Sequence, residues 1–170
     1  MKRIYLFSLI ALIGCLTIGL QSCVTDANAK VAVHLVDESE NLVWYQVYEL
    51  PSLQKEKRKK VIIDVYTDWC KWCKVMDEKT FGDANLAEYL ADQYHMVKLN
   101  AEEKSAITFK GKPYSFVASG KKGYNELALE LCQGSLSYPS LVILNEDLEV
   151  VDVVKGYKDA QYLRAHLDAL

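Results

Sequence analysis

Four stretches of the chain are rich in apolar and β-branched residues and are predicted to form strands. Residues 61–66 show little polar alternation, which is typical of a strand that is buried on both faces. Turn-forming residues at 145–148 separate the last two stretches and predict a hairpin-like connection. The predicted strands are residues 61–66, 94–100, 139–145 and 149–155.

Apolar residues at helical spacing predict helices before, between and after these strands. Pro51 disturbs the first of them, and Gly134 closes the helix that precedes the third strand. Residues 101–123 carry several glycines and indicate an irregular excursion that could include a small hairpin. The predicted helices are residues 42–60, 72–93 with a pause at 80–82, 124–133 and 159–170.

From the first strand onward, the elements follow the order β-α-β-α-β-β-α, which predicts an α/β fold with a mixed central sheet flanked by helices. The chain has 170 residues, of which 51% are hydrophobic and 25% charged. This composition suits one globular domain with a real core rather than a disordered chain. The formal charge of -3 gives no indication of nucleic-acid binding, so we expect no nucleic-acid partner.

The first residues resemble a bacterial export signal. Lys2 and Arg3 precede an apolar run over residues 4–20, which is short for a membrane span of about 20 residues. Residues 20–23 (LQSC) resemble the end of a lipoprotein signal. We therefore predict cleavage before Cys23, whose lipidation would anchor the protein to a membrane.

Two alternatives to the lipoprotein signal stay open. The small-x-small sequence that ends at Ala29 would allow an ordinary cut after this residue, and the apolar run could also be an uncleaved anchor. The preferred interpretation gives a signal segment (1–22), a tether (23–41) and a folded domain (42–170). It places the protein at the periplasmic face of a bacterial membrane, whereas a cut after Ala29 would give a soluble periplasmic protein.

Two of the five cysteines, Cys70 and Cys73, form a Cys-x-x-Cys pair where the first strand passes into a helix. Such a pair indicates a thiol–disulfide redox site. The free N–H groups and dipole of a helix start favour a thiolate, and Lys71 and Lys74 add positive charge. We therefore predict a lowered pKa for Cys70, the nucleophile, and a more buried, less acidic Cys73, the resolving residue.

Other interpretations of the cysteines are less favoured at this point. Cys70 and Cys73 could be half of a zinc site completed by Cys132 and His95, or a purely structural disulfide. Cys132 lies in an apolar stretch and is interpreted as a buried small side chain, with a third redox role as the alternative. We expect no metal and no cofactor.

The order of elements and the sequence WCKWCK at residues 69–74 resemble the thioredoxin superfamily, above all its exported branch with the active site Trp-Cys-x-Trp-Cys-Lys. The resemblance runs from about residue 42 to 170 and implies that this stretch is a thioredoxin-like domain. Separate positions that support it are Asp64, Lys98, Tyr138, Pro139 and Gly156.

The resemblance implies roles for these positions. Asp64 would be the buried proton acceptor for Cys73, with a pKa raised by burial, and Lys98 would be its partner. Pro139 would be cis and would face the two cysteines, so that a partner peptide could add there as a strand. The residues implied to contact the partner are Trp69, Lys71, Trp72, Tyr138 and Pro139.

Two departures from thioredoxin itself are visible. Lys71-Trp72 replace its Gly-Pro between the cysteines, and residues 102–131 are longer than the link of a minimal thioredoxin. The latter predicts an inserted segment before the cis-proline strand.

The predicted function is that of an exported thiol–disulfide oxidoreductase. It would reduce or exchange protein disulfides and take electrons from a membrane or periplasmic donor. The alternative is a thioredoxin-fold module that binds peptides or acts as a redox switch without turnover.

Overall fold

The computed structural model describes residues 42–120 and 122–170. The predicted signal segment, the predicted lipidation site Cys23 and the predicted tether lie outside the described residues. Within the described part, no helix combines the length and apolar character needed to cross a membrane.

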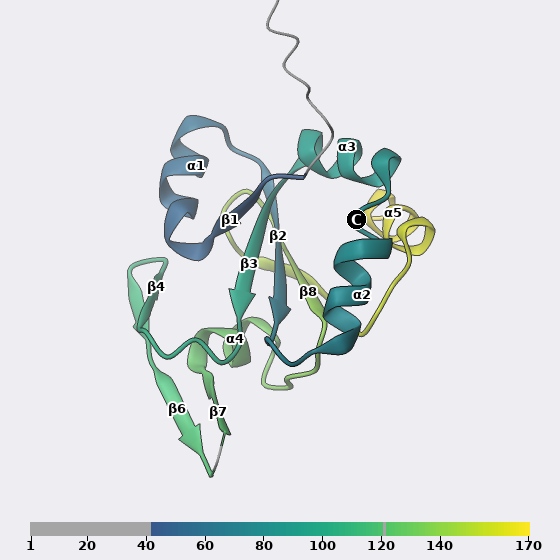
Figure 1. Ribbon diagram of the computed structural model, residues 1–170. Coiled ribbons are helices and arrows are strands. Elements are labelled where there is room, and N and C mark those ends of the chain that lie inside the picture. The colour runs from purple at the N-terminus through teal and green to yellow at the C-terminus, as the bar shows by residue number, and fades with distance from the viewer. Residues whose placement is uncertain (1–41, 121) are drawn as a thin grey trace, which may run out of the picture. The chain divides into compact units, whose positions relative to one another are not determined.

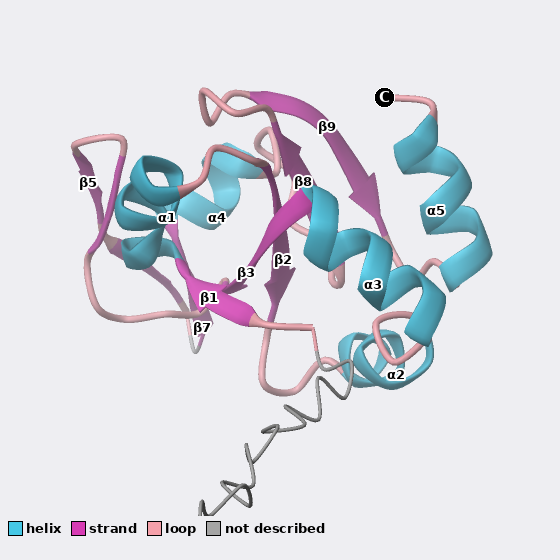
Figure 2. Cartoon of the chain, turned by 90° about the horizontal axis from the view of Figure 1, so that it is seen from above, coloured by secondary structure: helices cyan, strands magenta, loops and turns pink. Residues whose placement is uncertain are grey.

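Five strands form the central sheet in the order β1-β3-β2-β8-β9 (Figures 1 and 2). β1 (Trp44–Gln46), β3 (Tyr94–Asn100) and β2 (Lys60–Tyr66) run parallel to one another. β8 (Ser140–Leu144) is antiparallel to β2, and β9 (Val150–Lys155) is antiparallel to β8. The predicted mixed sheet is confirmed.

Helices cover both faces of this sheet (Figures 1 and 2). α2 (Lys71–Lys79), α3 (Ala84–Gln93) and α5 (Ala160–Asp168) pack on one face. α1 (Leu50–Glu56) and α4 (Glu126–Leu131) pack on the other. The predicted pause between α2 and α3 is confirmed, because the two helices end and begin on either side of residues 80–83.

Strand β2 is the centre of the core. Val61, Ile63 and Val65 face the α1/α4 layer, whereas Ile62 faces the layer of α2, α3 and α5. All four are completely buried, which explains the lack of polar alternation in this stretch. Each such side chain contributes on the order of 1.5–3 kcal/mol by its burial, so β2 is firmly held where it meets α2.

The stretch predicted as a helix over residues 42–60 has a different structure. It begins with strand β1, continues through a 3-10 turn, η1 (Val47–Glu49), and only then forms α1. The prediction of one helix is therefore wrong. Pro51 lies in the first turn of α1, where its missing N–H costs no hydrogen bond, and so it helps to begin the helix.

The inserted segment contains two hairpins. β4 (Ile107–Phe109) pairs with β5 (Lys112–Tyr114), and β6 (Phe116–Ser119) pairs with β7 (Lys122–Asn125). Because β7 includes Tyr124 and Asn125, α4 starts two residues later than predicted.

Asn125 fixes the base of the β6–β7 hairpin. Its backbone N–H donates to the Ala101 carbonyl at 2.7 Å, and its side-chain oxygen accepts from the N–H of Leu127 at 3.0 Å. The amide nitrogen donates to the carbonyls of Glu103 and Ser105 at 3.2 and 3.3 Å. This fully buried side chain thus joins the hairpin, the start of α4 and the loop after β3.

We expect Asn125→Ala to lower the free energy of unfolding by about 2–4 kcal/mol, because it leaves three backbone groups, one of them buried, without their partners. Urea unfolding of the oxidised protein measures this loss. Gln161→Ala, at an exposed position of α5, is the control and should change the value by less than about 0.5 kcal/mol. Equal effects of the two substitutions would contradict the anchoring role.

Candidate active site

The two cysteines of the predicted pair form a disulfide at the start of α2. The Cys70 and Cys73 sulfur atoms are 2.07 Å apart, and their Cα atoms are 5.3 Å apart. Cys70 is the N-cap residue of α2 and Cys73 lies in its first turn. Strand β2 therefore places both sulfur atoms where the chain turns into the helix.

One backbone donor of the helix start points to the Cys70 sulfur. The N–H of Cys73 lies 3.1 Å from the Cys70 sulfur, and the Cys70 N–H donates to the Thr67 carbonyl at 3.0 Å. In the reduced protein the same donor and the helix dipole would stabilise a Cys70 thiolate. The exposed Lys71 and Lys74 flank it in sequence. The lowered pKa of Cys70 stays a prediction.

The two cysteines do not differ in exposure as expected. Cys70 is 4% exposed and Cys73 is 3% exposed. In the closed disulfide each sulfur atom covers part of the other, so the expected contrast between an accessible and a buried cysteine is absent from this redox state.

Asp64, Lys98 and Asp77 form a charged cluster next to the disulfide-bearing helix. Asp64 of β2 lies opposite Lys98 of β3, and the Lys98 amine donates to Asp64 Oδ2 at 2.7 Å. The same amine also donates to Asp77, a residue of α2 one turn beyond Cys73. The structure thus brings Asp64 and Lys98 together and adds a second carboxylate.

Burial raises the pKa of Asp64, and the attraction of Lys98 only partly opposes this effect. Burial alone would lower the pKa of Lys98, but Asp64 and Asp77 outweigh it and the pKa is raised. The second oxygen of Asp64, Oδ1, is buried and has no hydrogen-bond partner among the described residues. This oxygen is therefore available to carry a proton.

Exposed tryptophans directly precede both cysteines of the disulfide. Trp69 and Trp72 are 56% and 58% exposed, which is unusual for so large an apolar side chain. The Trp69 ring meets Tyr138 edge-on at 5.7 Å between centroids, and Trp72 lies 5.5 Å from Tyr157. These rings provide an apolar rim that a partner could contact.

The predicted cis-proline position lies in the loop that enters β8. The Tyr138–Pro139 peptide bond is cis. The Pro139 carbonyl accepts a hydrogen bond from the Gly156 N–H at 2.8 Å, and Gly156 follows β9 with a φ of +75° that favours glycine. The last strand thereby fixes the proline loop.

Comparison with known proteins identifies the family of this chain. Residues 47–170 match the family model described as a thioredoxin-like domain, which is more than half of the chain. The chain belongs to this family. A Cys-x-x-Cys disulfide at a helix start, as in this chain, is typical of a thiol–disulfide redox site.

Two bacterial relatives match part of the thioredoxin-like protein. A segment of 77 residues is 36% identical to the thiol:disulfide interchange protein DsbD of Yersinia enterocolitica, and covers 41% of this chain and 13% of that protein. A segment of 63 residues is 35% identical to DsbD of Actinobacillus pleuropneumoniae, and covers 35% and 11%. The matched segments are thus a small part of these relatives.

Solved structures agree with the fold. A DsbH oxidoreductase superposes with a TM-score of 0.54 at 19% identity, over 76% of this chain and 85% of the other. A thioredoxin from Thermus thermophilus gives 0.55 at 17% identity, over 76% and 86%. At these identities the likeness concerns the fold of the thioredoxin-like protein alone.

The residues of the zinc interpretation do not come together as a metal site in the thioredoxin-like domain. His95 is hydrogen-bonded to the Lys57 carbonyl at 2.7 Å, and Cys132 is completely buried at the end of α4. Burial raises the pKa of Cys132 to about 11. Residues 42–120 and 122–170 contain no group of three or more His, Cys, Asp or Glu side chains placed to hold a metal ion.

Three contacts of the site were missed in the sequence. Asp77 follows Cys73 by four positions, a spacing that puts both on one helix face and that offered a signal. Trp69 also receives two contacts from the inserted segment, a hydrogen bond to Glu102 and the amine of Lys122 over its ring. No local pattern predicts these two, because they depend on how the insertion folds.

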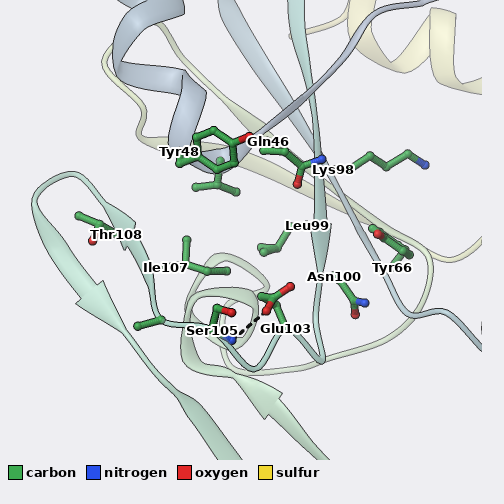
Figure 3. A pocket seen from close by; sticks show the side chains of 12 residues that line it. Gln46, Tyr48, Tyr66, Lys98, Leu99, Asn100, Glu103, Ser105, Ile107 and Thr108 are labelled. Carbon is green, nitrogen blue, oxygen red and sulfur yellow. Dashed lines mark hydrogen bonds between the residues drawn. The ribbon is translucent and has the colours of Figure 1, made fainter.

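A separate pocket of about 450 Å³ lies between η1, the end of β3 and residues 103–108 (Figure 3). Neither Cys70 nor Cys73 lines it. The side chain of Lys98 points away from its centre, toward the side on which Tyr66 lies (Figure 3). The pocket therefore borders the charged cluster without containing the redox pair.

We expect the free energy of unfolding of the oxidised protein to fall with rising pH when it is compared with that of the Asp64→Asn variant. A raised pKa in the folded state gives stability that is present below the unfolded value of about 4, and this stability is lost as the pH rises through the folded value. The loss amounts to about 1.4 kcal/mol for each unit by which the pKa is raised. Urea unfolding of both proteins from pH 4 to 8 measures it, and parallel curves would contradict it.

Proposed function

We propose that the protein is an exported oxidoreductase that reduces or exchanges disulfides of other proteins at the periplasmic face of a bacterial membrane. The observation that carries this proposal is the Cys70–Cys73 disulfide at a helix start, whose neighbour Trp69 is exposed and contacts Tyr138 of the cis-proline loop. Such a site suits a macromolecular partner, because the rim offers surface on which a polypeptide can lie.

In the reducing direction, the Cys70 thiolate attacks a partner disulfide. A bond forms between Cys70 and one partner sulfur, and the other partner sulfur leaves as a thiolate. Cys73, as a thiolate, then attacks the Cys70 sulfur. The Cys70–Cys73 disulfide forms, and the partner sulfur that was bonded to Cys70 leaves as a thiolate. Two electrons pass to the partner, and a dithiol donor in the membrane or periplasm restores the reduced pair.

Asp64 would accept the proton that Cys73 must lose before it attacks. The raised pKa of Asp64 supports this role, because a base whose pKa lies nearer the working pH takes a thiol proton more easily. Lys98 would hold the carboxyl in place through the bond to Oδ2, which leaves Oδ1 to receive the proton. Lys98 also offsets part of the cost of a buried carboxylate.

The partner would dock along the loop before β8. Pro139 has no N–H, so strand addition here would use the neighbouring backbone groups, as in other complexes in which an extended peptide adds to an exposed edge. The side chains proposed to contact the partner are Trp69, Lys71, Trp72, Tyr138 and Pro139.

The proposed location rests on the sequence. Residues 1–22 have the form of an export signal and Cys23 the position of a lipidated residue, and the relatives named DsbD are bacterial proteins of disulfide interchange. Disulfides persist in the bacterial periplasm, so proteins with disulfides that this protein could exchange are present there. A soluble periplasmic form would arise from a cut after Ala29.

We expect the reduced protein to catalyse insulin reduction by dithiothreitol, and Cys70→Ser to lower this activity by at least about a hundredfold, because it removes the attacking sulfur. The turbidity of the released insulin chains measures the rate. Cys132→Ala is the matched control and should keep the activity, since this buried cysteine lies outside the disulfide. A wild-type protein that binds peptides without any turnover would overturn the proposal in favour of a binding module.

For the anchor, we expect expression of the full chain in a bacterial host to give a membrane-bound protein whose first residue is an acylated Cys23. Mass spectrometry of the mature N-terminus identifies this residue. Cys23→Ala should move the protein out of the membrane fraction, because the acyl chains supply the attachment. A mature chain that begins at Lys30 would instead establish the soluble form.

A further inference from the structure

The two hairpins of the inserted segment have a charge opposite to that of the chain as a whole, although the rest of the segment, to residue 131, adds Glu126 and Glu130. Residues 101–125 contain five lysines and two glutamates, a formal charge of +3 in a chain whose formal charge is -3. Both glutamates make hydrogen bonds within the molecule, Glu102 with the Trp69 indole and Glu103 with the N–H of Ser105. Lys112 pairs with Glu130, whereas Lys122 is exposed, so Lys122 offers its positive charge to a partner.

The β6–β7 hairpin of this segment stands beside the redox site on a fixed base. Asn125 anchors it from within, and the Ser115 carbonyl and N–H bond to the N–H and side chain of Glu126 at 2.9 and 2.8 Å. The ring of Phe116 lies over Gly123, where any side chain would clash with it. In Figure 1 the hairpin lies at the end of the sheet toward which β2 and β3 run.

The hairpin reaches the active site through Trp69. The amine of Lys122 in β7 lies 4.4 Å from the centre of the Trp69 ring, while the indole N–H donates to Glu102 at 3.0 Å. The same ring also meets Tyr138, which precedes Pro139, in an edge-on contact. A polypeptide that covers Cys70 and the proline loop must therefore come within reach of Lys122.

The two strands of the hairpin also leave backbone edges open. β6 and β7 pair only with each other among the described residues, so each has one edge without a strand partner. Ala118, Ser119 and Lys122 are exposed there. An extended chain can pair with such an edge, and acidic side chains on it would approach Lys122.

We propose that the β6–β7 hairpin is a docking arm that selects partners with an extended acidic segment next to the disulfide. This inference rests on the proposed exchange of protein disulfides and names the chemistry of the partner. Charge complementarity of this kind acts chiefly on the rate of encounter and on the choice of partner.

The test uses two synthetic peptides with one cysteine each, activated as a mixed disulfide with thiopyridine and flanked by either four glutamates or four lysines. Pre-reduced full-length protein attacks the peptide sulfur, and the released thiopyridone is followed by its absorbance in a stopped-flow instrument. We expect the acidic peptide to react about three- to tenfold faster at low salt, and this ratio to approach one in about 0.5 M NaCl.

Three variants locate the preference. Lys122→Glu should bring the ratio of the two peptide rates to about one or below, whereas Lys122→Arg should keep it. Lys55→Glu changes the net charge equally on α1, outside the inserted segment, and should also keep the ratio. Because the two peptides are compared within each variant, a general change of thiol reactivity cancels.

The outcomes separate the two proposals. A wild-type protein that reacts with dipyridyl disulfide and reduces insulin but treats both peptides alike overturns the docking arm alone. A preference that persists in Lys122→Glu, or that disappears equally in Lys55→Glu, also overturns it. Absence of reaction with dipyridyl disulfide and insulin overturns the proposed function, and with it the inference that rests on it.

Discussion

The passage from strand β2 into helix α2 is the constraint on which the site depends. β2 lies between β3 and β8 and is buried on both faces, so the point at which it ends cannot shift without disrupting the core. Cys70 takes the N-cap position there, and Cys73 follows in the first turn. The buried strand thus holds the site in place. The first N–H groups of the helix have no partners within the helix and can donate to a thiolate.

The same strand, β2, carries a buried charged residue, Asp64. Asp64 alternates with apolar neighbours and points to the face on which α2 packs, where it meets Lys98 rather than water. A buried pair of this kind gives little net stability, because desolvation of both groups offsets their attraction. Its position beside the redox pair fits the proposed proton transfer, and the Lys98 amine also contacts Asp77.

Much of this fold follows from local pattern, and the exceptions have physical causes. Residues 61–66 and 94–100 are strands in both prediction and structure, because burial on two faces leaves both stretches mostly apolar. Residues 42–60 were misassigned, since Trp44 and Val47 satisfy a helical spacing and are equally suited to an edge strand and the turn after it. The Cys-x-x-Cys spacing predicts the disulfide. The contact between Lys122 and Trp69 could not be predicted, because the two residues are more than fifty positions apart and meet only when the insertion folds.

In the proposed recognition, the insertion would give a common redox scaffold its own choice of partner. Its anchoring residue, Asn125, is fully buried, whereas its strands expose backbone and charge. A rigid base means that little conformational freedom is lost when a partner binds, so more of the interaction energy is available for discrimination. Since the Trp69 ring contacts both Lys122 and Tyr138, the proposed recognition by the hairpin and access to Cys70 would share one contact surface.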